Sequence, residues 1–123
     1  MGKNILIIED NEQNMYLVTF ILEKNGHSVV QARSGDEGLR VAASCEPDLI
    51  LLDIQLPVMD GYTVARELRK IPALAQIPII AVTSFAMPGD REQALGAGCT
   101  GYIEKPIDPD TFITQVNEHL PSH

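Results

Sequence analysis

The sequence predicts an α/β fold in which a parallel five-stranded sheet is covered by helices on both faces. Short apolar runs recur along the chain, and a longer segment of helical character separates each run from the next. The runs are continuous rather than alternating, which is typical of parallel strands that helices bury on both faces. The five runs are Ile5–Ile8, Val29–Val30, Leu49–Leu52, Ile79–Val82 and Tyr102–Ile103.

The first two helices follow the first two runs. Gly26 is expected just beyond the end of the first helix as its C′ residue, and Asp10 or Asn11 could cap its start. The second helix is predicted to open with Ser34 and Glu37, which have the spacing of a capping box. The buried stripe of the first helix is Leu17, Val18, Ile21 and Leu22.

The other three helices have different start signals. Asp60 can cap the third helix, and Pro88-Gly89-Asp90 marks the start of the fourth. Glycines at positions 96 and 98 indicate that the fourth helix is short and marginally stable. Asp108-Pro109 is typical of an N-cap followed by a proline in the first turn and predicts the start of the last helix. The stripe of that helix is Phe112, Ile113, Val116 and Leu120.

The composition fits one domain and excludes several classes of protein. With 123 residues, 45% of them hydrophobic, the chain can build one core and has no room for a second domain. A net charge of −8 would repel nucleic acid. Cys45 and Cys99 lack metal-ligand spacing and are expected to be free thiols. No apolar run is long enough for a signal peptide or a membrane span, so we expect a cytoplasmic protein without a membrane partner.

Ionisable and hydroxyl side chains follow the predicted strands at their carboxyl ends, where open parallel sheets bind ligands. Glu9 and Asp10 follow the first run, Asp53 the third, Thr83 the fourth and Lys105 the fifth. If the first and third strands are neighbours, three carboxylates lie together and raise one another's pKa. A hard divalent cation would relieve this repulsion, and Mg²⁺ is commonly held by carboxylates, water and phosphate oxygens.

The same residues suit phosphoryl transfer. Asp53 could attack phosphorus to give an acyl phosphate, while Lys105 and Thr83 contact the phosphoryl oxygens. Each signal alone has a plainer explanation, with Lys105 a solvated surface lysine, Thr83 an ordinary strand-end hydroxyl and Asp10 a helix cap. Their agreement at one edge of the predicted sheet favours the chemical interpretation.

The chain contains, in this order, the segments Glu9-Asp10-Asn11, Leu51–Gly61, Ala81–Ser84 and Tyr102–Pro106. Together these four segments resemble the receiver domain of two-component response regulators. The segments Glu9–Met15 and Ser84–Met87 look most like the free-standing single-domain regulators of the DivK type. The resemblance implies a flavodoxin-like (CheY-like) doubly wound sheet of five parallel strands in the order 2-1-3-4-5, with five helices. It also implies one response regulatory domain over residues 1–123 without an output domain.

The resemblance assigns a metal site and a phosphoacceptor by position. Asp53 would accept a phosphoryl group from a phosphohistidine on a histidine kinase or phosphotransfer protein. Mg²⁺ would be held by Glu9, Asp10, Asp53 and the backbone carbonyl of Gln55. Glu9-Asp10 stands where the family more often has two aspartates, which keeps the charge.

Further roles follow from the same resemblance. Thr83 and Lys105 would contact phosphoryl oxygens, and the peptide bond before Pro106 would be cis. Tyr102 would be the aromatic switch, although it could also be only an aromatic at the edge of the core. The signal would be a changed surface over the fourth helix, fifth strand and fifth helix, recognised by an unknown target protein, with the chain a monomer or a phosphorylation-dependent dimer.

Two positions are expected to set the lifetime of the acyl phosphate. The Gln55 side chain would face the phosphate, and Phe85 is bulky where many receivers carry a polar residue that helps to position water. We therefore expect slow self-dephosphorylation. The domain would not be an enzyme on other substrates, because it catalyses only its own phosphorylation and dephosphorylation.

Three alternatives remain at this stage, one of which is a pure interaction module that keeps the fold without phosphorylation. The chain could be a receiver excised from a hybrid histidine kinase or from a longer regulator. A small phosphatase of the haloacid dehalogenase type is less favoured, because those enzymes need Asp-X-Asp and this chain has Asp53-Ile54-Gln55.

Overall fold

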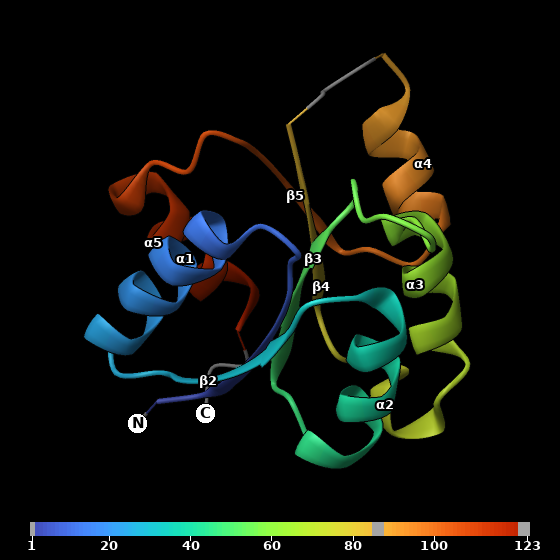
Figure 1. The fold of residues 1–123 in the computed structure, drawn as a ribbon, viewed down its shortest axis with the longest axis horizontal. Coiled ribbons are helices and arrows are strands. Elements are labelled where there is room, and N and C mark those ends of the chain that lie inside the picture. The colour runs from blue at the N-terminus through green and yellow to red at the C-terminus, as the bar shows by residue number, and fades with distance from the viewer. Residues whose placement is uncertain (1, 85–87, 121–123) are drawn as a thin grey trace.

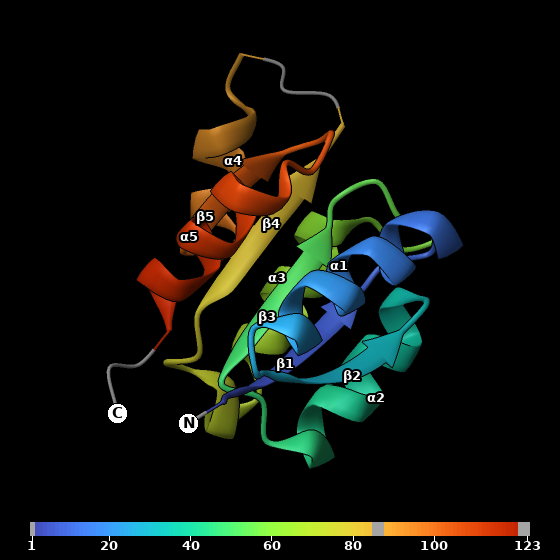
Figure 2. The ribbon, with the colours of Figure 1, turned by 90° about the vertical axis from the view of Figure 1, so that its left-hand side faces the viewer.

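The computed structural model describes residues 2–84 and 88–120, which fold around one parallel sheet. The strand order is β2-β1-β3-β4-β5, as the resemblance implied. All neighbouring strands are parallel, so their carboxyl ends meet at one edge of the sheet (Figure 2). The strands are β1 (Asn4–Ile8), β2 (Ser28–Ala32), β3 (Leu49–Asp53), β4 (Ile79–Thr83) and β5 (Gly101–Glu104).

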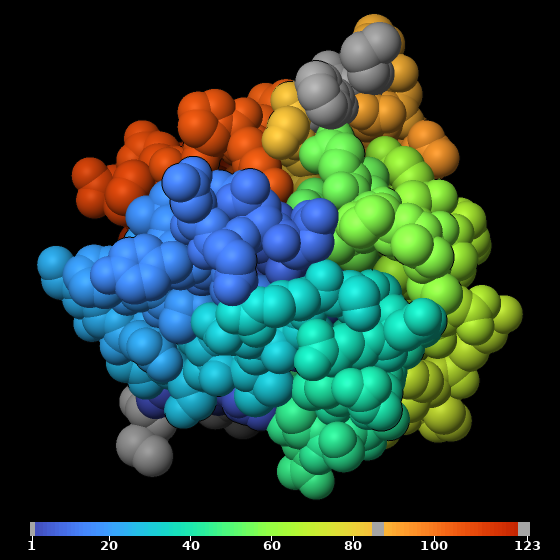
Figure 3. All heavy atoms as spheres, viewed as in Figure 1, coloured from blue at the N-terminus to red at the C-terminus, as the bar shows by residue number. Residues whose placement is uncertain are grey.

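Five α-helices in the described residues form the two outer layers. Helices α1 and α5 cover one face of the sheet, and α2, α3 and α4 cover the other (Figure 1). Figure 3 shows α5, in orange and red, lying directly against α1, in blue. The helices are α1 (Glu12–Lys24), α2 (Gly35–Cys45), α3 (Gly61–Arg69), α4 (Asp90–Gly96) and α5 (Pro109–His119).

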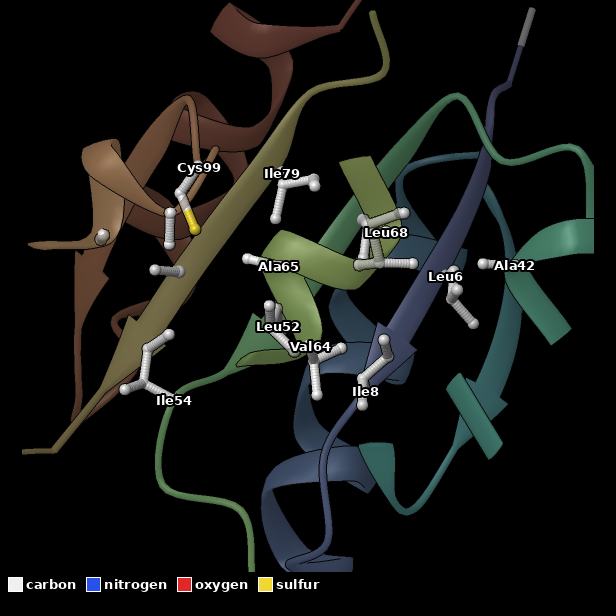
Figure 4. Packing of buried hydrophobic residues seen from close by; sticks show 14 of the residues in the cluster. Leu6, Ile8, Ala42, Leu52, Ile54, Val64, Ala65, Leu68, Ile79 and Cys99 are labelled. Carbon is white, nitrogen blue, oxygen red and sulfur yellow. The ribbon is translucent and has the colours of Figure 1, made fainter. Parts of the chain in front are cut away.

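The sheet separates two hydrophobic clusters because successive strand residues point to opposite faces. One cluster joins alternate residues of β1 and β3 to α2, α3 and α4, and Figure 4 shows Leu6, Ile8 and Leu52 facing this layer. The other joins the intervening residues to α1 and α5. Strands β3 and β4 are buried throughout, which explains their unbroken apolar runs.

The caps of the first two helices refine what the spacing predicted. Asn11, not Asp10, caps α1, because its side chain accepts a hydrogen bond from the Asn14 backbone N–H (2.9 Å). Ser34 caps α2 through the Glu37 N–H (3.1 Å). The capping box was wrong in one detail, since the Glu37 carboxylate accepts from the Arg33 N–H rather than from that of Ser34.

The remaining boundaries agree with their signals. Asp60 and Asp108 accept backbone hydrogen bonds at the starts of α3 and α5. Gly26 has φ +89°, the left-handed conformation expected of a C′ glycine. Helix α4 has only seven residues, as its glycines indicated. A 3₁₀ helix at Pro72–Leu74 was not predicted. None of the helices in the described ranges is long and apolar enough to cross a bilayer.

Candidate functional site

Two neighbouring strands bring the acidic side chains together at the carboxyl edge. Strand β1 pairs with β3 so that Ile8 lies beside Leu52, and each strand delivers its acidic residues just beyond that pair. Asp53 ends β3 and Glu9 follows β1, and both side chains are buried. The first turn of α3 closes over this point, because Gly61 donates to the Ile54 carbonyl (3.0 Å).

The three predicted carboxylates form one cluster. Oxygens of Glu9, Asp10 and Asp53 all lie within 4.8 Å of one another. Glu9 and Asp53 are only 4% and 3% exposed, whereas Asp10 faces solvent. Since Asn11 caps α1, the Asp10 carboxylate is not used as that cap. The cluster therefore has two buried acids at its floor and one at its open side.

Lys105 lies against both buried acids. Its Nζ is 3.1 Å from Glu9 Oε1 and 3.5 Å from Asp53 Oδ2, and its side chain is 11% exposed. The three carboxylates and this ammonium group carry a formal charge of −2 when all are ionised. That excess charge is the electrostatic reason to expect a divalent cation here, since buried charges persist only with partners.

Burial and the neighbouring Asp53 carboxylate raise the pKa of Glu9 from 4.5 to about 7. The hydrogen bond from the Asn11 N–H to Glu9 Oε2 (3.1 Å) and the charge of Lys105 oppose this rise and are outweighed. The Glu9 carboxyl is consequently partly protonated near neutral pH. A cation that binds the cluster must displace that proton.

Thr83 and Gln55 meet across the gap between β3 and β4. Gln55 Nε2 donates to Thr83 Oγ1 (2.6 Å), and the Ser84 N–H donates to Gln55 Oε1 (2.9 Å). The Gln55 backbone N–H also donates to Asp53 Oδ1 (2.9 Å). Gln55 thus connects the candidate phosphoacceptor to the end of β4, a link that its position in the sequence alone did not indicate.

The structure describes two of the three remaining predicted residues, Pro106 and Tyr102. The Lys105–Pro106 peptide bond is cis. Tyr102 lies in β5, half-buried against the cluster that contains α4. Burial, followed by the Asp90 carboxylate at the start of α4, raises the pKa of its phenol. Phe85 lies outside the described residues.

Comparison with known proteins gives the same picture over nearly the whole chain. A family model described as the response regulator receiver domain matches residues 5–117. The polar-differentiation response regulator DivK of Brucella ovis is 45% identical over 120 residues, which cover 98% of each chain. DivK of Brucella anthropi is 44% identical with the same coverage.

Solved structures agree with these sequence matches. The receiver domain of a sensor histidine kinase from Pseudomonas aeruginosa, crystallised with a magnesium ion in its active-site cleft, has a TM-score of 0.89 and 35% identity. The match covers 97% of this chain and 98% of that one. Chemotaxis protein CheY4 of Vibrio cholerae has a TM-score of 0.93 and 26% identity, with 98% and 100% covered.

Proposed function

The chain belongs to the response regulator receiver family of two-component signalling, and from this premise we propose that Asp53 is the side chain that accepts its phosphoryl group. One observation carries the proposal: the buried Asp53 carboxylate shares Lys105 with a second buried acid inside a cluster of three carboxylates. An aspartate that served only as a helix cap or a core ion pair would not need that cluster.

The residues present fit a magnesium ion. Mg²⁺ prefers oxygen ligands and is usually held by one or two carboxylates together with water and phosphate oxygens. We assign Glu9, Asp10, Asp53 and the backbone carbonyl of Gln55 as its protein ligands. When bound, the ion would supply charge neutralisation for the phosphoryl oxygens.

In the proposed reaction an Asp53 carboxylate oxygen attacks the phosphorus of a phosphohistidine. A new O–P bond forms, the P–N bond breaks, and the imidazole leaves with the electron pair and takes up a proton. The Lys105 ammonium neutralises charge on the transferred group, and the Thr83 hydroxyl donates to one of its oxygens. The domain would act on no substrate other than its own Asp53.

The added negative charge is proposed to alter the surface formed by α4, β5 and α5. Thr83 is joined to β5 because its carbonyl accepts from the Lys105 N–H (2.7 Å), and Tyr102 lies on the same strand. Helix α4 is short and begins after Gly89 in a left-handed conformation (φ +90°), so its rearrangement would cost little. Phosphorylation would then shift the equilibrium between two conformations of this segment.

The expected partners are a phosphohistidine donor, either a sensor histidine kinase or a phosphotransfer protein, and a downstream target protein. Both cysteines are free thiols, which supports a reducing compartment such as the cytoplasm. The net charge of −8 supports a protein rather than a nucleic acid as the direct partner.

Intact-mass spectrometry after incubation with acetyl phosphate tests the proposal. The wild-type chain should gain one phosphoryl group in Mg²⁺ and none in EDTA, and Asp53→Asn should gain none. Asp48→Asn is the matched control, because Asp48 precedes the opposite end of β3 and accepts a hydrogen bond from the Asn4 N–H there. Phosphorylation of Asp53→Asn, or of wild type without the metal, would remove the proposal.

A further inference from the structure

The Gln55 side chain extends the β3–β4 pairing beyond the last backbone hydrogen bond between these strands. That last bond runs from the Ile54 N–H to the Val82 carbonyl (2.9 Å). Just beyond this bond, the Gln55 carboxamide donates to Thr83 Oγ1 and accepts from the N–H of the next residue, Ser84. A carboxamide has the same donor and acceptor groups as a peptide unit, so it can serve as one more rung of the ladder.

The Gln55 carboxamide is hydrogen-bonded to groups that a phosphoryl group on Asp53 would also need as partners. A phosphoryl group brings three acceptor oxygens. The Ser84 N–H is a donor next to the site, and it is already bonded to Gln55 Oε1. Gln55 itself is tied to the phosphoacceptor, because its own N–H donates to Asp53 Oδ1.

We infer that Gln55 is a clamp that holds the end of β4 in its resting position, and that a phosphoryl group on Asp53 must displace the Gln55 carboxamide oxygen from the Ser84 N–H. This inference rests on the proposed function, in which the Thr83 hydroxyl at the end of β4 donates to a phosphoryl oxygen. Charge makes the exchange favourable, since hydrogen bonds to an ionised acceptor are roughly twice as strong as neutral ones. Gln55 is therefore a positioning residue that opposes activation.

The clamp predicts which way its removal shifts the equilibrium. Gln55→Met keeps the length of the side chain and removes both hydrogen bonds. Because the two hydrogen bonds are neutral and partly exposed, we expect them to favour the resting over the active position of β4 by a factor of about three to ten. The variant should therefore populate the active position more in the absence of any phosphoryl group.

Gln31→Met is the matched control. Gln31 on β2 also donates from Nε2 to a threonine hydroxyl, that of Thr19 (2.9 Å), but this pair lies on the edge strand and does not contact Asp53 or β4. The control removes the same kind of hydrogen bond and should leave the equilibrium of β4 unchanged.

The experiment is a titration with beryllofluoride, a mimic of the phosphoryl group, in Mg²⁺, followed by ¹⁵N–¹H NMR of the Thr83 and Ser84 amides. In ligand-free Gln55→Met these resonances should lie on the line from the resting to the saturated wild-type position, displaced toward the saturated end. The dissociation constant of beryllofluoride should fall about threefold to tenfold. Gln31→Met should match wild type in both readouts.

The inference is overturned if the ligand-free resonances of Gln55→Met stay at the wild-type resting position, or if beryllofluoride binds more weakly to the variant than to wild type. Weaker binding would mean that Gln55 supports the phosphoryl group instead of opposing it. Failure of the proposed function is distinguishable, because wild type itself would then show no saturable response to beryllofluoride and no phosphorylation by acetyl phosphate.

Discussion

Replacement of Glu9 by glutamine should stabilise the metal-free protein above neutral pH. Glu9 is buried beside Asp53, which together with burial raises its pKa to about 7 from the ordinary 4.5. The folded state therefore binds this proton more tightly than the unfolded chain. The resulting stabilisation is fully present below pH 4.5, declines above it, and is lost as the pH rises through about 7.

The size of the effect follows from the two pKa values. Between pH 5 and pH 8 the wild-type protein should lose about 2–3 kcal/mol of unfolding free energy that Glu9→Gln keeps, at about 1.4 kcal/mol for each unit of pKa. For a chain of this size that difference is about 10 °C in melting temperature. Comparing the two proteins at each pH cancels the contribution of the ionisable groups that both proteins share.

The assay is urea or thermal unfolding from pH 5 to pH 8 in EDTA and again in excess Mg²⁺. In Mg²⁺ the wild type should recover stability at pH 8, because the cation binds the ionised cluster, whereas Glu9→Gln should gain much less. Asp10→Asn is the control. Asp10 is exposed and is not a cause of the Glu9 shift, so this variant should keep the metal-free pH dependence and lose Mg²⁺ stabilisation.

The reasoning is refuted if the stability difference between wild type and Glu9→Gln in EDTA does not change from pH 5 to pH 8. A constant difference would mean that Glu9 is ionised in the folded protein throughout that range.

Three other perturbations probe the charge, the backbone and the lifetime of the site. Lys105→Met should slow phosphorylation by acetyl phosphate about a hundredfold, because it removes the cation beside Asp53; an unchanged rate in stopped-flow measurements would exclude that role. Gly61→Ala should lower the free energy of unfolding in urea by about 1–3 kcal/mol, since a Cβ there would lie 2.5 Å from a backbone Cα. Gly96→Ala, where a Cβ would enter open space, should raise it by about 0.5–1 kcal/mol. Equal effects of the two substitutions would contradict the packing argument. Phe85→Glu should speed decay of the acyl phosphate about tenfold or more, measured by loss of phosphorylated mass, and an unaltered decay would end the lifetime hypothesis.

The sheet and its covering helices could be predicted because parallel strands buried on both faces leave a simple signal. Strands β3 and β4 are unbroken apolar runs, and the sequence located them to within one residue. Strand β2 was predicted only as Val29–Val30 but extends over Ser28–Ala32. It is an edge strand, and two polar residues, the exposed Ser28 and the half-buried Gln31, limit its apolar run to two residues.

The residues of the site could be predicted because the carboxyl ends of the strands share one edge of the sheet. The contacts between those residues could not be predicted. Their positions after the strands predicted that Glu9, Asp53 and Lys105 lie together. They did not show that the Lys105 ammonium group contacts both acids. The pKa of Glu9 depends on burial, which only the packed structure provides. The bridge from Gln55 to the end of β4 depends on the side-chain conformation of a loop residue, which no sequence pattern specifies.

Chemical trapping of the acyl phosphate tests the central claim most directly. Borohydride reduces an aspartyl phosphate to homoserine and leaves free carboxylates intact, so peptide mass spectrometry after incubation with acetyl phosphate and Mg²⁺ identifies the modified residue. We predict homoserine at position 53 alone, and its absence when Mg²⁺ is withheld. Homoserine at position 10 or 48 instead, or unmodified Asp53 in protein that has gained a phosphoryl group, would contradict the assignment.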